Sequence, residues 1–167
     1  LINGAEKFSS IGNKKSAGTK LVCLDSFFNN PGVYEIDMGT SMKKIFNEIG
    51  EGYKEPIKAF QIGGPLGGVV PLKEIENLNL DFQEFTSKGF MLGHASVVSI
   101  PKDFPMTEYI HHLFEFSAEE SCGKCFPGRL GSYRGKEMFD QAKKKTAKIP
   151  LKLLNELLVT MQKGCLC

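Results

Sequence analysis

The stretch Leu21–Met38, LVCLDSFFNNPGVYEIDM, decides the fold of the first part of the chain. It opens with the short apolar run Leu21–Leu24, and in Val33–Met38 apolar and polar residues alternate with a period of two. Between these two segments lies Asn29–Gly32, whose Pro-Gly pair is a strong turn signal. We therefore predict two antiparallel strands joined by a turn.

The residues after this hairpin extend it into a mixed module. A helix is predicted between an N-cap at Thr40 or Ser41 and a C-cap at Gly50, because apolar residues recur there at helical spacing: Met42, Ile45, Phe46 and Ile49. Next come an alternating strand at Ile57–Ile62, a glycine-rich turn at 63–68, a strand at 69–70, a helical turn at 81–88 and a strand within 91–100. This order of elements predicts a β-grasp-like α+β domain.

From Asp103 onward the period of the apolar residues changes to that of helices. We predict one helix over about 106–118 with Asp103 or Thr107 as its cap, a second over 129–145, and a third that starts with Pro150 at its first position. The third helix carries an apolar stripe and ends at Gly164; the stripe is Leu153, Leu154, Leu157, Leu158 and Met161. The predicted fold class is therefore α+β, a β-grasp-like domain followed by a small three- to four-helix bundle. Its boundaries are a linker at 1–18, the β-grasp-like domain at 19–101 and the bundle at 102–167.

Composition places the chain among globular proteins and excludes some partners. It has 167 residues, 41% of them hydrophobic and 24% charged, which is enough apolar surface for a core. The net charge is only +2, so we expect no nucleic-acid partner. No apolar run reaches the roughly 18–20 residues that cross a bilayer, so we expect no direct membrane insertion.

Four of the five cysteines form two pairs near the end of the chain. Cys122 and Cys125 form a C-x-x-C in the turn between the first two predicted helices, where Gly123 lets backbone amides point inward and Lys124 favours thiolate. Cys165 and Cys167 follow the third helix, which could fold back to bring the pairs together.

Four gathered thiolates could hold a metal ion or an iron–sulfur cluster. The alternatives are that these cysteines are small buried hydrophobic residues, or that the C-x-x-C is a thioredoxin-like redox pair; the βαβ context of a thioredoxin motif is absent here. Cys23 lies within an apolar strand, and we expect it to be a packed core thiol.

The segment Phe114–Arg129, FEFSAEESCGKCFPGR, closely resembles the signature E-S-C-G-K-C-T-P-C-R. That signature occurs in the NADH-binding flavoprotein subunit of respiratory complex I and in related NAD-linked hydrogenase and formate dehydrogenase subunits. The segments Asn30–Glu35 and Gln61–Gly64 resemble that family's soluble-ligand-binding β-grasp (SLBB) domain, and Leu166-Cys167 is similar to its distal S-L-C cysteine.

The resemblance implies a [4Fe–4S] cluster that takes electrons from FMN, with Cys122, Cys125 and Cys167 matching three of the family's four metal ligands. The remaining family cysteine falls on Gly128, so one ligand is missing, and Cys165 is the available substitute. A neutral fourth ligand would make the cluster less negative and raise its potential. FMN and NAD(H) are implied only on a missing upstream domain, so we expect this chain to be a piece of a longer polypeptide, truncated at its C-terminus.

The implied function is electron transfer within an NADH:acceptor (quinone) oxidoreductase, an NADH dehydrogenase, with backbone amides near Gly123 and Lys124 tuning the cluster. The expected partners are the upstream flavin- and NADH-binding domain and an iron–sulfur subunit of the complex. We expect a cytoplasmic location in the peripheral arm of a membrane-associated complex, and no catalytic residue or catalysis on this chain alone. The alternative is a structural docking module with a degenerate cluster site, or a structural zinc site built from four cysteines.

The other polar residues are not expected to form a catalytic or metal-binding site. His111 and His112 lie in a predicted helix and are expected to be packing residues rather than metal ligands. The carboxylates of Glu115, Glu119 and Glu120 are expected to form a solvated helix face. The turn at 63–68 fits neither dinucleotide-binding nor Walker patterns and is expected to be structural.

Overall fold

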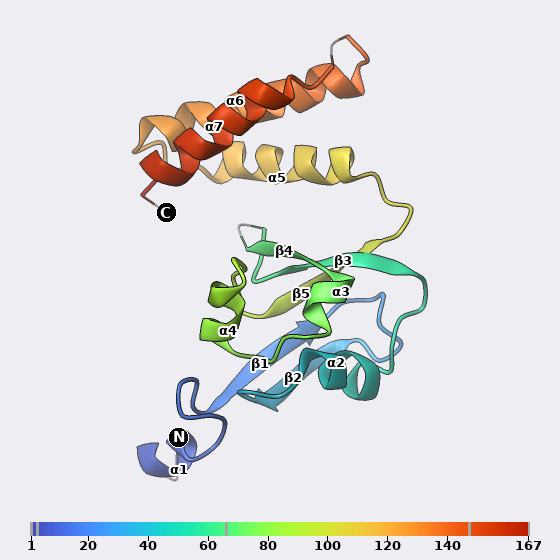
Figure 1. Ribbon diagram of the computed structural model, residues 1–167, viewed down its shortest axis with the longest axis vertical. Helices are drawn as coiled ribbons and strands as arrows, with labels where there is room; N and C mark the ends of the chain where they lie inside the picture. The colour runs from blue at the N-terminus through green and yellow to red at the C-terminus, as the bar shows by residue number, and fades with distance from the viewer. Residues whose placement is uncertain (1, 3, 66, 147, 167) are drawn as a thin grey trace. The chain divides into compact units, whose positions relative to one another are not determined.

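The computed structural model describes residues 2, 4–65, 67–146 and 148–166. The chain divides into two compact units, Leu1–Asp103 and Phe104–Cys167 (Figure 1). The first unit combines a sheet with short helices, and the second is helical. The predicted α+β fold class is confirmed.

The first unit is built on a mixed sheet that has five strands in the described residues: β1 (Thr19–Leu24), β2 (Gly32–Asp37), β3 (Ile57–Ile62), β4 (Gly68–Pro71) and β5 (Ser96–Pro101). Their order across the sheet is β2-β1-β5-β3-β4. The central strands β1 and β5 run parallel, and the other neighbouring pairs are antiparallel. This is the order of a β-grasp sheet, in which the first and last strands meet in the middle.

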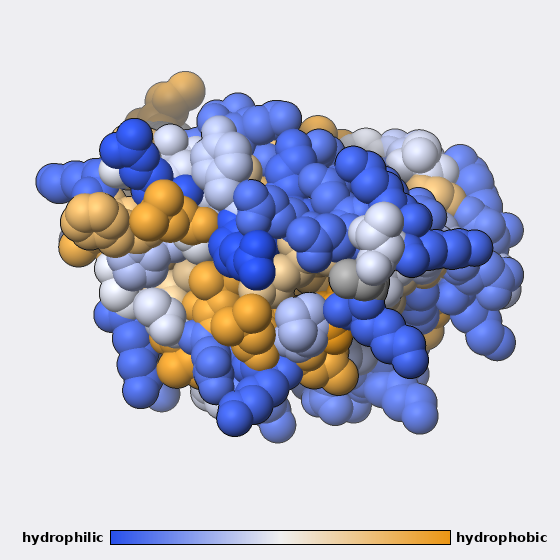
Figure 2. Space-filling model, turned by 90° about the horizontal axis from the view of Figure 1, so that it is seen from above, coloured by the Kyte–Doolittle hydropathy of each residue, from blue (hydrophilic) through white to orange (hydrophobic). Residues whose placement is uncertain are grey.

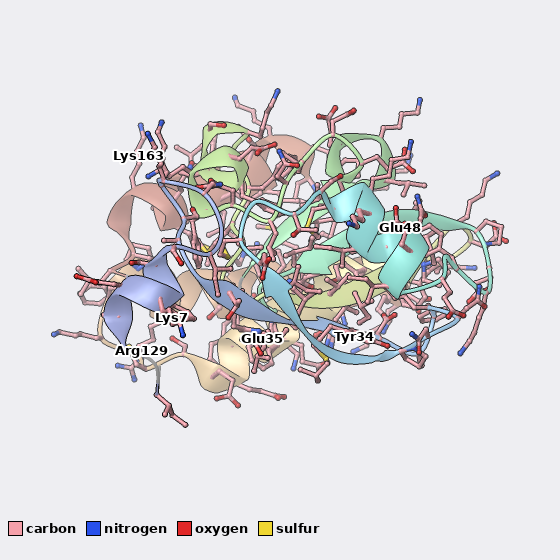
Figure 3. All side chains as sticks on the ribbon, turned by 90° about the horizontal axis from the view of Figure 1, so that it is seen from below. Lys7, Tyr34, Glu35, Glu48, Arg129 and Lys163 are labelled. Carbon is pink, nitrogen blue, oxygen red and sulfur yellow. The ribbon has the colours of Figure 1, made fainter. Side chains whose placement is uncertain are left out.

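The predicted hairpin is confirmed as the pair β1 and β2. Leu21 lies opposite Glu35 in the register, and the Thr19 hydroxyl donates a hydrogen bond to the Glu35 carboxylate (2.7 Å). The Tyr34 hydroxyl donates to the backbone carbonyl of Asn30 in the turn (3.0 Å). Tyr34 and Glu35 are neighbours on β2 (Figure 3), and their bonds run to different parts of the hairpin, Tyr34 to the turn and Glu35 to Thr19 at the start of β1.

Cys23 is exposed, so the prediction of a core thiol is wrong. Side chains of a strand alternate between its two faces, and Val22 and Leu24 are the residues of β1 that point into the core. Cys23 therefore lies on the other face, opposite the exposed Val33 of β2. An apolar run of four residues hides this alternation.

Helix α1 (Ala5–Ser9) precedes β1, and short helical segments connect later strands: α2 (Met42–Lys44), α3 (Leu72–Ile75) and α4 (Phe82–Ser87). The predicted helix between Ser41 and Gly50 is present, but its second half, η1 (Ile45–Ile49), is a π-helix. Helix α4 lies in the predicted helical turn, and the Asp81 carboxylate caps it by accepting the N–H groups of Gln83 and Glu84. Helices α1 and α3 are too short for their residues to show a helical period.

Aromatic rings form the centre of the first unit's core. The rings of Phe28, Phe46 and Phe60 are fully buried, and their centroids lie 5.2 Å (Phe28 to Phe46) and 4.7 Å (Phe46 to Phe60) apart. Phe46 comes from η1 and Phe60 from β3, so these contacts fix the helix against the sheet.

The second unit consists, in the described residues, of three helices: α5 (Met106–Glu120), α6 (Phe126–Lys143) and α7 (Leu151–Gly164). Helix α6 packs against both α5 and α7. Buried Phe114, Met138 and Phe139 form the core of this unit, and α7 contributes Leu154, Leu157 and Met161 from the predicted stripe. The other two members of that stripe, Leu153 and Leu158, are exposed.

Glycines on α6 let its neighbours approach closely. A Cβ atom at Gly135 would overlap the ring of Phe114 from α5. A Cβ atom at Gly131 would lie 2.8 Å from Cγ of Met161 on α7. Helix α6 therefore packs closely against α5 at Gly135 and against α7 at Gly131, as the middle helix of the unit.

Three helix starts differ from the predictions, and each lies at a proline. Helix α5 begins at Met106 with Pro105 as its N-cap, so neither Asp103 nor Thr107 caps it. Helix α6 begins at Phe126, three residues before the predicted Arg129, because a proline in the first turn is tolerated where its missing N–H has no partner to lose. The earlier start makes Cys125 the N-cap of α6. Pro150 is likewise the N-cap of α7 rather than its first residue.

Apolar side chains also remain on the surface. Phe126, Leu130 and Tyr133 on α6 are exposed, as are Leu151 and Val159 on α7. Figure 2 shows hydrophobic side chains gathered on the face of the molecule seen from above. Within the described residues, no helix combines the length and hydropathy needed to cross a membrane.

Candidate metal centre

The C-x-x-C lies in the connection between α5 and α6. Helix α5 ends at Glu120, and Gly123 then adopts a left-handed conformation with a φ of 70°. The N–H of Gly123 donates to the hydroxyl of Ser121 (3.3 Å), which closes the turn. This turn leads directly into Cys125, so both thiols lie within one short loop at the start of α6.

Three backbone N–H groups favour the ionised form of the Cys125 thiol: that of Leu166, after the end of α7, that of Gly128 in the first turn of α6, and that of Cys125 itself. Together with a hydrogen bond from the Cys165 thiol, they hold the pKa of Cys125 below its usual range. The surroundings of Cys125 therefore favour a thiolate, the form in which cysteine binds metal.

The end of α7 meets the start of α6 at this point. Cys165 is the C-cap of α7, and its N–H donates to the carbonyl of Met161 (2.9 Å). A Cβ atom at Gly164 would lie 2.8 Å from Cγ of Pro127, so a glycine is needed for α7 to approach α6 this closely. Residues distant in the sequence thus bring Cys165 beside Cys125.

Gly128 faces the same two sulfurs. A Cβ atom at this position would lie 3.0 Å from Sγ of Cys125 and 3.5 Å from Sγ of Cys165. The signature has a cysteine at this position. Its side chain would project toward the same side of α6 as the thiols of Cys125 and Cys165.

The remaining predicted site residues are not gathered in the same way. Cys122 and Lys124 are exposed in the loop, and Cys167 lies outside the described residues. Among the residues that the structure describes, no three His, Cys, Asp or Glu side chains gather closely enough to hold a metal ion. The structure therefore places Cys125 and Cys165 together and leaves Cys122 apart from them.

The donor atoms nevertheless suit a soft metal or an iron–sulfur cluster. All are thiols, and thiolates are the ligands that iron–sulfur clusters and structural zinc prefer. None of Cys122, Cys125 and Cys165 is buried, so they are not packed core residues. Arg129 in the first turn of α6 and Lys163 in the last turn of α7 are exposed basic residues at these helix ends (Figure 3).

A polar pair that the sequence analysis missed joins α5 to α6 elsewhere. His111 is buried, and its Nε2 lies 2.8 Å from Oδ1 of Asp140, which lowers the pKa of that carboxyl. Its position three residues before Phe114 places it on the apolar face of α5, which is the signal that could have revealed it. His112 is exposed. Of the carboxylates expected to be solvated, Glu115 pairs with Lys136 of α6 (3.0 Å).

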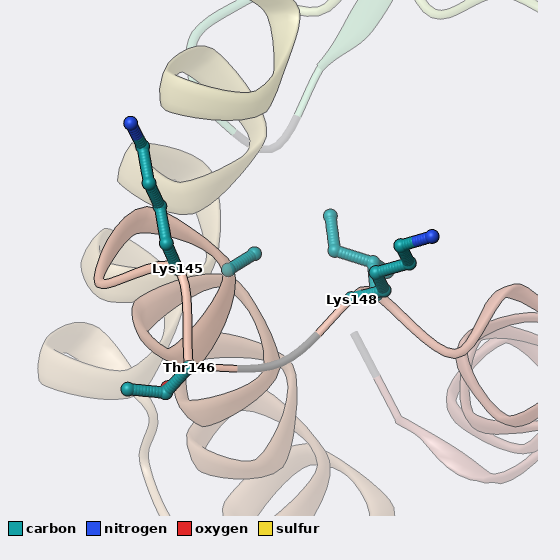
Figure 4. A pocket seen from close by; sticks show the side chains of 5 residues that line it. Lys145, Thr146 and Lys148 are labelled. Atoms are coloured by element: carbon teal, nitrogen blue, oxygen red, sulfur yellow. The ribbon is translucent and has the colours of Figure 1, made fainter.

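An open pocket of about 610 Å³ lies at the connection between α6 and α7 (Figure 4). It is lined by Ala142, Lys145, Thr146, Lys148 and Ile149. These residues include no thiol, imidazole or carboxylate, so the pocket offers no soft metal ligands. It adjoins the C-terminal end of α6, whereas Cys125 stands at the N-terminal end.

Residues 108–167 match the family of the NADH-ubiquinone oxidoreductase-F iron-sulfur binding region. These residues belong to that family. The match contains both cysteine pairs and all of α6 and α7. The family resemblance drawn from the C-x-x-C signature is thereby confirmed.

Known relatives extend the similarity to the first unit. The chain is 33% identical over 170 residues to the NADP-reducing hydrogenase subunit HndC of Solidesulfovibrio fructosivorans, covering 100% of this chain and 34% of that protein. It is 30% identical over 168 residues to the mitochondrial NADH-ubiquinone oxidoreductase 51 kDa subunit of Aspergillus niger, covering 98% of this chain and 34% of that protein.

A solved structure shares the fold. A chain of the NAD+-reducing [NiFe]-hydrogenase in the H2-reduced state matches with a TM-score of 0.84 and 25% identity, covering 99% of this chain and 28% of that one. The chain spans about a third of the length of the curated relatives that it matches.

Proposed function

We propose that this chain carries a [4Fe–4S] cluster that passes electrons within an NADH-oxidising enzyme, with Cys122, Cys125 and Cys167 as ligands. The observation that carries the proposal is the meeting of helix ends at one place: the C-x-x-C loop opens α6, and the end of α7 brings Cys165 against Cys125. All of these residues lie in the part of the chain that matches an iron-sulfur binding region.

The residues of the loop have defined roles in this proposal. The N–H groups of Leu166 and Gly128 donate to the sulfur of Cys125, and such bonds to a ligating sulfur raise the potential of a cluster. Gly123, with its left-handed backbone conformation, allows the loop to turn, and Lys124 places a positive charge between the two cysteines. When bound, a cluster of this kind accepts and releases one electron at a time.

The electron donor and acceptor lie on other parts of the enzyme. We propose FMN reduced by NADH, on a domain upstream of this chain, as the donor, and an iron–sulfur centre of a partner subunit as the acceptor, with quinone further on. The names of the relatives, a hydrogenase subunit and an NADH-ubiquinone oxidoreductase subunit, support this assignment. Such an enzyme would place the chain in the cytoplasmic peripheral arm of a complex, with residues 19–101 as its soluble-ligand-binding domain.

Exposed apolar residues beside the cysteines support a partner contact. Phe126, Leu130 and Tyr133 follow one another at helical spacing along α6, starting directly after Cys125. Exposed apolar patches of this kind mark interaction sites. A partner seated there would lie next to the electron-transfer centre.

Anaerobic reconstitution of the 167-residue chain with ferrous iron and sulfide tests the proposal. We expect about four irons and four sulfides per chain and an electron paramagnetic resonance signal after reduction. One zinc per chain and no iron would instead indicate a structural tetrahedral site, and no metal at all a docking module. Cys125→Ser should abolish iron binding, whereas Cys23→Ser, a matched change on an exposed strand, should leave it intact.

The chain alone should oxidise no NADH, because the proposed flavin domain lies elsewhere. NADH oxidation by the purified chain without added flavin would contradict this part of the proposal.

A further inference from the structure

Gly128 and Cys165 lie on either side of one small space. Measured from where a Cβ atom of residue 128 would stand, Sγ of Cys165 is 3.5 Å away and Sγ of Cys125 is 3.0 Å away. A cysteine at position 128 would place its own sulfur one bond further into this space. The sulfur of Cys165 therefore reaches, from α7, the region that a sulfur on α6 would otherwise occupy.

The backbone holds Cys165 in this position. The hydrogen bond from its N–H to Met161 keeps it on the last turn of α7, and Gly164 lets that turn approach Pro127. Met161 itself packs against Gly131 of α6 and belongs to the core of the unit. The position of Cys165 thus depends on packing between helices.

We propose that Cys165 replaces the thiolate that Gly128 lacks, so that Cys122, Cys125, Cys165 and Cys167 form the ligand set. This inference rests on the proposed function and names the fourth ligand of that site. Coordination releases the thiol proton of Cys165 to solvent as its sulfur bonds to iron. Relative to the signature, the fourth ligand then lies at the end of α7 instead of in the first turn of α6. The cluster would keep four thiolates and their negative charge.

The exchange also accounts for glycine at position 128. A Cβ atom there would lie 3.0 Å from Sγ of Cys125, which is tighter than ordinary contact, and 3.5 Å from Sγ of Cys165, which is ordinary van der Waals contact. A cysteine at position 128 would extend its sulfur from a Cβ atom that already touches Sγ of Cys165, so cysteines at both positions would compete for one place.

The test compares the 167-residue chain with Cys165→Ser, the double variant Cys165→Ser/Gly128→Cys and the control Cys23→Ser, all reconstituted anaerobically. Iron, sulfide and the rate of iron loss to a chelator are measured, and far-UV circular dichroism checks folding. We expect Cys165→Ser to lose iron at least about tenfold faster, since even a change outside the ligand shell costs metal affinity that much. The double variant should lose iron at the wild-type rate, and so should the control Cys23→Ser.

Alkylation of the unmutated chain gives a second readout. Iodoacetamide should spare Cys165 while iron is bound and modify it after the iron is removed, whereas the exposed Cys23 should react in both states. The proposal is overturned if Cys165 reacts while iron is bound, if Cys165→Ser keeps the wild-type rate, or if a folded double variant loses iron as fast as the single one.

The two proposals fail differently. A wild-type chain that takes up no iron refutes the proposed function and this inference together. A wild-type chain that holds four irons with Cys165 reactive refutes this inference alone.

Discussion

Replacement of Gly135 by alanine tests whether close contact between α5 and α6 holds the helical unit together. A Cβ atom at this position would lie 2.6 Å from Cζ of Phe114 and closer still to two other ring atoms. Carbon atoms make contact at roughly 3.5–4.0 Å, so the nearest atoms of the ring would have to move by roughly 1.4–1.9 Å. Phe114 is buried and stacks on Phe139 with centroids 5.8 Å apart, so it has no free space to enter.

Two opposing effects set how much Gly135→Ala changes the free energy of unfolding. Alanine in a helix interior is about 1 kcal/mol more favourable than glycine. Overpacking of a well-packed core costs about 1–3 kcal/mol, and the severe overlap with Phe114 places Gly135→Ala at the upper end. The free energy of unfolding should therefore fall by about 2 kcal/mol, which lowers the melting temperature of a unit of this size by roughly 8–16 °C.

The assay is thermal unfolding followed by circular dichroism at the helix band, because α5, α6 and α7 are the long helices of the described chain. Gly131→Ala is the matched control. Its nearest neighbours are Cγ and Sδ of Met161, at 2.8 and 2.9 Å, and this flexible side chain can shift. Gly135→Ala should therefore melt well below Gly131→Ala. An unchanged or raised melting temperature for Gly135→Ala would mean that helix propensity outweighs the contact, and the packing argument would be refuted.

Three further predictions concern charge, thiol reactivity and the glycine-rich turn. His111 lowers the pKa of Asp140, so the ionised carboxylate stabilises the fold fully at a pH above its ordinary pKa of about 4. This stabilisation is lost as the pH falls through the lowered pKa. Asp140→Asn should therefore make the free energy of unfolding fall less in acid, as measured by urea unfolding at several pH values. In the iron-free chain, the alkylation rate of Cys125 should reach its midpoint at a lower pH than in the urea-unfolded chain, as followed by mass spectrometry of its peptide. Gly63→Ala should destabilise the first unit by about 1–3 kcal/mol in urea unfolding, because Gly63 has a φ of 84° and a Cβ atom would lie 2.8 Å from a backbone carbonyl; equal stability would contradict this.

Local patterns predict the elements that depend on neighbouring residues. The hairpin of β1 and β2 follows from a turn between two β-type segments, and α7 from the spacing of Leu154, Leu157 and Met161. The patterns are wrong where the local signal is ambiguous. Four consecutive apolar residues do not reveal which of them face the core, so the pattern places Cys23 inside although it is exposed.

Helix starts are also beyond local reasoning. Asp103 and Thr107 are good capping residues, but Pro105 lies between them and α5 begins after it. The predicted start of α6 is three residues too late. A proline such as Pro127 can end a helix or lie in its first turn, and the neighbouring residues do not show which of these applies. Because α6 starts at Phe126, Cys125 is its N-cap and Gly128 lies in its first turn, so both belong to the site.

The sequence by itself determined the α+β class, the order of the elements, the C-x-x-C between two helices and the glycine at position 128. Only the tertiary structure decided that Cys165 lies beside Cys125 while Cys122 remains exposed in its loop. The reason is physical: residues in one loop are brought together by short-range geometry, but the ends of α6 and α7 meet where Gly164 lets α7 approach Pro127 of α6 closely. That contact has no local signature, and it is what places a second sulfur opposite Gly128.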